Sequence, residues 1–149
     1  MGWPLPLCAL LALALGACGG TAPLPQSCLE ARDGDVLRAL RHAPGDVALH
    51  DGTPISTCVA RAIGDVDLQV VGVALTVAAD RLAQRVAGSD RAAFQLGFLM
   101  GATERGAART TGVQSELSSR VRQAAGLEGG PPARHAALLR GRAAGRRGG

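Results

Sequence analysis

The residues whose types and spacing come closest to a catalytic group are His50, Asp51 and Ser56, which lie close together in the sequence. A base, an orienting carboxylate and a hydroxyl are the parts of a hydrolytic site. The pair Asp51-Gly52, however, is typical of a tight turn, and Ser56 stands where it would cap a short helix. His50 then has no partner, and the sequence predicts no catalytic residue.

Two acidic pairs are the other candidates for ligand chemistry. Asp33 with Asp35, and Asp65 with Asp67, resemble fragments of calcium loops, but the further oxygen ligands and the distal Glu are missing. We therefore expect solvated turns at both places. No glycine-rich loop follows a predicted strand, so a cradle for phosphate or a dinucleotide is not expected. The sequence predicts no metal and no cofactor.

The N-terminal residues have the pattern of an export signal. Residues 5–15 form an apolar run that is shorter than the roughly 20 residues of a membrane span and suits a signal peptide. The sequence Leu15-Gly16-Ala17-Cys18 that follows resembles the lipobox of bacterial lipoproteins. This resemblance implies that residues 1–17 are removed and that Cys18 carries a diacylglyceryl group. Such a group would hold the protein at the cell membrane, on the extracytoplasmic side.

One departure from this pattern leaves alternatives open. Residues 1–4 contain no Lys or Arg, although a signal peptide begins with positive charge. A misassigned start codon would explain the difference. An ordinary secretory signal cut after Ala22, and an uncleaved helix, are the alternatives to a lipid anchor. Residues 18–26 are small, polar and proline-bearing, which is typical of a flexible tether.

The cysteines also indicate an extracytoplasmic location. If the lipobox is used, the first cysteine leaves with the signal and Cys18 takes the lipid. Cys28 and Cys58 then remain as a pair in an oxidising environment, which predicts a disulfide. A zinc site that adds His42 and His50 is the alternative, but zinc sites favour closely spaced ligand pairs that this sequence lacks.

Helical periodicity dominates residues 27–126 and predicts an all-α domain, a small bundle of about four helices. Apolar residues recur at steps of three and four over 66–87 and again over 91–107. The broad apolar face of 66–87 is typical of a central helix in a bundle. Because 66–77 is rich in β-branched residues, a buried strand there is the alternative.

Local signals predict where the shorter elements begin and end. Hydroxyl side chains that accept hydrogen bonds from the first turn of a helix are expected at Ser27, Ser56, Ser89 and Thr111. Apolar residues alternate around Asp51-Gly52, which predicts a short β-hairpin at 47–55 on the helical body. Gly97 and Gly101, four residues apart, predict close packing against the helix of 66–87.

The composition changes after residue 126. Residues 18–126 contain as many arginines as acidic residues, so the formal net charge of +4 belongs to residues 127–149. We expect this Arg-rich segment to be disordered. Its arginines would be attracted to anionic lipids or wall polymers, and they are Arg134, Arg140, Arg142, Arg146 and Arg147. A merely solubilising segment is the alternative.

Composition and resemblance together lead to a prediction of function. Aromatic residues are only 2% of the chain, too few for the stacking platforms of single-stranded nucleic-acid binding. Residues 51–58, 96–102 and 106–110 resemble a group of small exported bacterial proteins, a resemblance that implies no activity or ligand. We predict a non-enzymatic, lipid-anchored module that binds a protein or an envelope polymer. The alternative is a small-ligand binding protein with a groove between the helices of 66–87 and 91–107.

Overall fold

The structure is a computed structural model that describes residues 22–108, 110, 112–125 and 132–149. Within these residues the chain forms seven helices and no β-strand, which confirms the all-α class and corrects the expected number of helices. The helices are α1 (Gln26–Glu30), α2 (Asp33–Leu40), α3 (Ile55–Arg61), α4 (Asp65–Val86), α5 (Asp90–Ala107), α6 (Val113–Ala124) and α7 (Pro132–Gly148). The export signal and the lipidation site at Cys18 lie outside the described residues.

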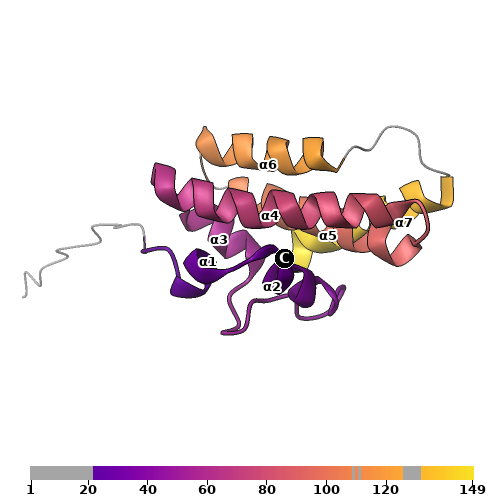
Figure 1. Ribbon diagram of the computed structural model, residues 1–149, viewed down its shortest axis with the longest axis horizontal. Coiled ribbons are helices and arrows are strands. Elements are labelled where there is room, and N and C mark those ends of the chain that lie inside the picture. Colours follow the sequence, from indigo (N-terminus) through magenta and orange to yellow (C-terminus); the bar gives the residue numbers. More distant parts are fainter. Residues whose placement is uncertain (1–21, 109, 111, 126–131) are drawn as a thin grey trace, which may run out of the picture.

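Helix α5 is the centre of the fold. Helices α3, α4, α6 and α7 all pack against it, and α1 and α2 pack on α4 (Figure 1). Small and apolar residues occur on every side of α5, as expected for a helix that other helices surround. Leu96, Phe98 and Leu99 are completely buried there and form the middle of the hydrophobic core.

Helix α4 confirms the helix predicted over 66–87 and shows that the strand alternative is wrong. Its buried side presents Val71, Leu75 and Leu82 to the core. The expectation of a very broad buried face is only partly met, because Val73 is exposed to solvent. Of the predicted helix caps, Ser89 is confirmed: its Oγ accepts a hydrogen bond from the Ala92 N–H at 3.1 Å.

Residues 132–148 form helix α7, in place of the disorder expected over 127–149. Ala137 and Leu138 are buried on its inner side. Figure 1 shows α7 lying beside α5, although the two helices are separated in the sequence by α6. The physical reason for the difference is tertiary packing, which composition does not report.

Glycines bring α5 and α7 into backbone contact. A Cβ atom at Gly97 would lie 2.0 Å from the Leu138 carbonyl oxygen, and one at Gly145 would lie 2.1 Å from the Phe98 carbonyl oxygen. Gly101 is packed in the same way against Arg142. The glycine pair therefore packs closely as predicted, but against α7 and not against α4.

Two predicted caps and the predicted hairpin are wrong, each because of a proline. Helices α1 and α3 begin directly after Pro25 and Pro54, so Ser27 and Ser56 lie inside their helices. Proline fixes φ at a helical value and so favours an early helix start. At 47–55 only one antiparallel bridge forms, between Ala48 and Pro54. Because proline has no N–H, it cannot extend a ladder of strand hydrogen bonds.

The predicted disulfide joins Cys28 of α1 to Cys58 of α3, with their Cα atoms 5.4 Å apart. It links two helices that are separated by 30 positions in the sequence, and both cysteines are buried. Because the bond uses both sulfur atoms, the alternative zinc site with His42 and His50 is wrong. No helix of the described part combines the length and hydropathy that crossing a membrane requires.

Candidate functional site: a groove between α4 and α6

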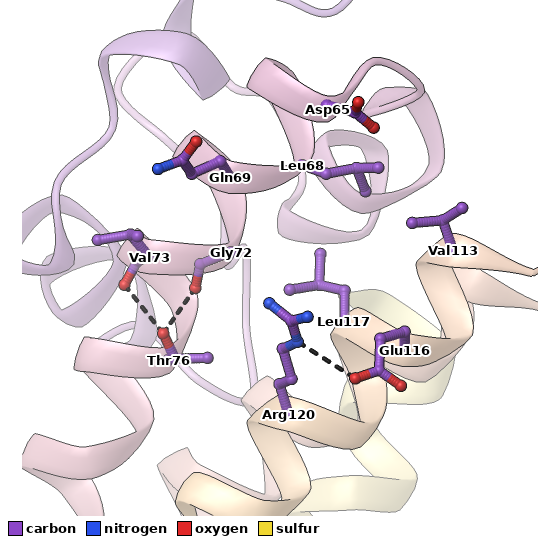
Figure 2. A pocket seen from close by; sticks show the side chains of 10 residues that line it. All are labelled: Asp65, Leu68, Gln69, Gly72, Val73, Thr76, Val113, Glu116, Leu117 and Arg120. Carbon is purple, nitrogen blue, oxygen red and sulfur yellow. Dashed lines mark hydrogen bonds and ion pairs between the residues drawn. The ribbon is translucent and has the colours of Figure 1, made fainter.

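A groove with a volume of about 550 Å³ lies between α4 and α6 (Figure 2). Leu68, Gly72 and Leu117 are among the residues that line it. A Cβ atom at Gly72 would stand 3.3 Å from Cδ1 of Leu117, so the missing side chain lets Leu117 pack close to α4. The groove is therefore built by one small residue on α4 and one large residue on α6.

The groove is bordered by apolar side chains that face solvent. Val73 of α4 is 57% exposed and Val113 of α6 is 56% exposed. Val66, about two turns before Val73 on the same side of α4, is 70% exposed. Scattered exposed apolar residues are ordinary on soluble proteins, but a cluster beside a groove marks an interaction surface.

A second groove continues this surface on the other flank of α4. It has a volume of about 390 Å³ and is bordered by α1, α2 and α4. Gln69 and Val73 line both grooves, so they form a ridge between them. Leu29 of α1, which is also exposed, lies on the far side of the second groove.

Charged groups are arranged unevenly along the first groove. Figure 2 shows Asp65 at one end of the groove, with the paired side chains of Glu116 and Arg120 further along on the α6 wall. The Arg120 Nε donates to Oε1 of Glu116 at 3.2 Å. The Thr76 hydroxyl donates to the Gly72 carbonyl oxygen at 2.8 Å, within its own helix. Asp65 therefore makes the end where α4 begins acidic, and it also complements the N-terminal dipole of that helix.

The side chains considered for catalysis are placed apart from this groove and have partners of their own. The Asp51 carboxylate accepts hydrogen bonds from the Thr53 N–H and hydroxyl, both at 2.9 Å. The bond from the Thr53 backbone is the largest of the effects that hold the pKa of Asp51 below its ordinary value. Ser56 is buried, and its hydroxyl donates to the Gly149 carbonyl oxygen. His50 is exposed.

The five arginines expected to contact a polyanion fall into two groups. Arg134 approaches Asp90, with Nε and Oδ1 4.0 Å apart, and Arg140 is exposed on α7. Arg142, Arg146 and Arg147 instead come together in a wide depression of about 690 Å³, where α5, α6 and α7 meet. The fold therefore separates residues that the sequence presented as one group.

The depression is also lined by two arginines that the sequence analysis did not identify. They are Arg105 of α5 and Arg122 of α6. The available signal was their position, because each stands in the last turn of a helix, as Arg146 and Arg147 do in α7. Recognising them as neighbours required knowing that residues 132–148 form a packed helix.

Glu104 organises the arginines of α7. Its Oε1 accepts a hydrogen bond from Arg142 Nε at 2.8 Å and its Oε2 accepts one from Arg146 Nε at 2.6 Å. Burial alone would raise the pKa of Glu104, but the two arginines outweigh it and hold the pKa below its ordinary value of 4.5.

The described residues contain no group of three or more His, Cys, Asp or Glu side chains that could hold a metal ion. The groove predicted between the helices of 66–87 and 91–107 stays a prediction; in the structure those helices, α4 and α5, pack against each other, and the groove described above lies between α4 and α6. Comparison of the chain with protein-family models, with curated proteins and with solved structures finds no match.

Proposed function

We propose that this protein is a non-enzymatic, lipid-anchored module on the extracytoplasmic side of the cell membrane, which binds a helix of a partner protein in the α4–α6 groove. The observation that carries the proposal is an open groove lined by the exposed valines Val73 and Val113, with Val66 exposed about two turns before Val73 on the same side of α4. An amphipathic helix that binds in a groove places apolar residues at helical spacing into such a surface.

Charge complementarity favours a particular kind of helix. Asp65 makes one end of the groove acidic, whereas Glu116 further along is paired with Arg120. A partner helix with basic residues at one end and apolar residues at intervals of about one and two turns would match both features. Val66 and Val73 are about two turns apart, which is the repeat that such a helix would present.

The anchor is supported by the lipobox and by the disulfide. The sequence Leu15-Gly16-Ala17-Cys18 carries the resemblance to lipoproteins, and a Cys28–Cys58 bond persists in oxidising compartments. The intact mass of the unreduced protein from its producing cell tests the anchor. A mass that begins at Cys18 and includes acyl chains supports it, whereas an unlipidated mass supports the secreted alternative.

The groove is tested by placing a photoactivatable cross-linker in the protein within intact producing cells. At positions 73 and 113 we expect a discrete protein adduct that Val66→Glu abolishes. The same cross-linker at Leu139, an exposed apolar residue of α7, is the matched control and should give no such adduct.

Each other outcome counts against a partner helix. An adduct of low mass at positions 73 and 113 would favour the small-ligand alternative. Equal cross-linking at position 139, or an adduct that survives Val66→Glu, would show that the groove is not the binding surface. Far-UV circular dichroism of each variant confirms that the fold is intact.

A further inference from the structure

The depression lined by α5, α6 and α7 concentrates positive charge far beyond what its surroundings neutralise. Its lining includes five arginines and one carboxylate, that of Glu104. Arg142 and Arg146 are committed to Glu104 by hydrogen bonds and ion pairs. The remaining three, Arg105, Arg122 and Arg147, have no carboxylate partner within the described residues.

Helix dipoles account for only part of this arrangement. A cation in the last turn of a helix is stabilised by about half a negative charge at that end. Three helix ends together with Glu104 therefore balance roughly half of the five guanidinium charges. Among the residues that the structure describes, nothing else compensates the remaining charge, so the local positive potential is raised and attracts anions.

The three uncommitted guanidinium groups come from three different helices, yet two are held in place by neighbours. Arg105 donates to the Arg147 carbonyl oxygen, so it also joins α5 to the end of α7. Arg122 donates to the Ser119 hydroxyl at 2.8 Å. Each group keeps further N–H donors, because a guanidinium has five. Donors fixed by neighbours lose less conformational entropy when an anion binds.

From this geometry we propose that the depression binds an anionic chain of several phosphate groups. Guanidinium groups match phosphate oxygens in pairs of hydrogen bonds, which makes Arg the preferred residue for phosphate recognition. The depression is wide and open, and its volume of about 690 Å³ exceeds what one phosphate fills. Separate donors on α5, α6 and α7 then bind successive phosphates of one chain. Glu104 accepts hydrogen bonds from Arg142 and Arg146 and so holds their guanidinium groups in position within the depression.

The test measures binding of a short linear polyphosphate to the purified full chain by isothermal titration calorimetry. The triple variant Arg105→Gln, Arg122→Gln, Arg147→Gln should weaken binding by about tenfold or more, since a hydrogen bond to a charged group is worth roughly that factor. The matched control is Arg41→Gln, Arg61→Gln, Arg85→Gln, which removes the same charge from exposed arginines elsewhere. Binding by the control should stay within about twofold of wild type and keep its dependence on salt.

Several results would overturn the proposal. Equal losses in the two triple variants would show a response to net charge, not to a site. Absence of polyphosphate binding by the wild-type chain at low salt would refute the site directly. A monomeric short-chain phosphatidylglycerol separates the sources of phosphate, because equal affinity for it would assign the depression to a single lipid headgroup. If the triple variant does not fold, Arg122→Gln alone carries the test, since its described partner is only Ser119.

Discussion

At the scale of single residues, Glu104 is the side chain whose charge does most to join two helices. It is only 16% exposed and accepts hydrogen bonds from Arg142 and Arg146 of α7. Those arginines outweigh the effect of burial and hold the pKa of Glu104 below 4.5. A carboxyl group whose pKa is lower in the folded protein contributes stability above its ordinary pKa, and this contribution is lost as the pH falls through the folded value.

We therefore expect Glu104→Gln to lower the free energy of unfolding by about 1–2 kcal/mol at neutral pH, after allowing for the solvent that reaches the pair. Urea unfolding followed by circular dichroism measures the change. The difference from wild type should shrink as the pH is lowered below 4.5. Glu116→Gln is the matched control, because its pair with Arg120 is exposed on both sides and contributes little. Equal effects of the two substitutions, or a difference that does not change with pH, would contradict this role for Glu104.

At the scale of elements, the contact between α5 and α7 is set by glycine. Gly97 and Gly101 of α5 meet the backbone of α7, and Gly141 and Gly145 meet the backbone of α5. Glycine costs a helix about 1 kcal/mol relative to alanine, so these positions weaken each helix by itself. The close approach that they permit is what brings α7 against the core.

This arrangement predicts opposite effects for two identical substitutions. Gly97→Ala places a Cβ atom 2.0 Å from the Leu138 carbonyl oxygen and should destabilise the protein by about 2–3 kcal/mol, because the helices must separate. Gly34→Ala, in α2, meets no atom within 4 Å and should stabilise by about 0.5–1 kcal/mol. Thermal unfolding of both variants measures the two signs. A Gly97→Ala variant as stable as wild type would mean that α7 does not pack against α5 in this way.

The elements also show how far the sequence could predict this fold. The bounds of α4 and α5 follow from periodic apolar residues and from Ser89, because these signals are local. The helical state of α7 could not be predicted, since a segment rich in Arg and Gly has a low helical propensity and is stabilised by distant contacts. Because those distant contacts cannot be read from the sequence, the places of Arg105 and Arg122 in the depression could not be predicted either. The α4–α6 groove depends on Gly72 facing Leu117, which is likewise a pairing between distant residues.

At the scale of the whole molecule, one buried framework supports two chemically different surfaces. The α4–α6 groove is bordered by exposed valines, whereas the depression at α5, α6 and α7 is lined mainly by arginine. Of the helices that the structure describes, only α6 contributes to both, with Leu117 in the groove and Arg122 in the depression. A partner helix and an anionic chain could thus be bound together, and α6 is the element through which one would affect the other.

The Cys28–Cys58 disulfide acts at the same scale, because it constrains the unfolded chain as a whole. It closes a loop of 30 positions, and in the chain-entropy model a loop of that length stabilises the folded state by about 3–4 kcal/mol. Cys28→Ala/Cys58→Ala should therefore unfold at a much lower urea concentration than the oxidised protein. The effect should be greatest for α1, a helix of five residues that packs mainly on α4.

Both cysteines are buried, so the double variant also loses packing around the two sulfur atoms. Wild type unfolded and refolded in the presence of a reductant separates these effects, because it keeps the sulfur atoms and lacks only the bond. We expect the reduced wild type to lose most of the stability that the double variant loses. Hydrogen exchange should then be fastest in α1, while α4 and α5 stay protected, since their contacts do not depend on the bond. Equal stability of oxidised and reduced protein would show that α1 is held by packing alone, and the disulfide would then no longer support an oxidising compartment as the place where this fold is stable.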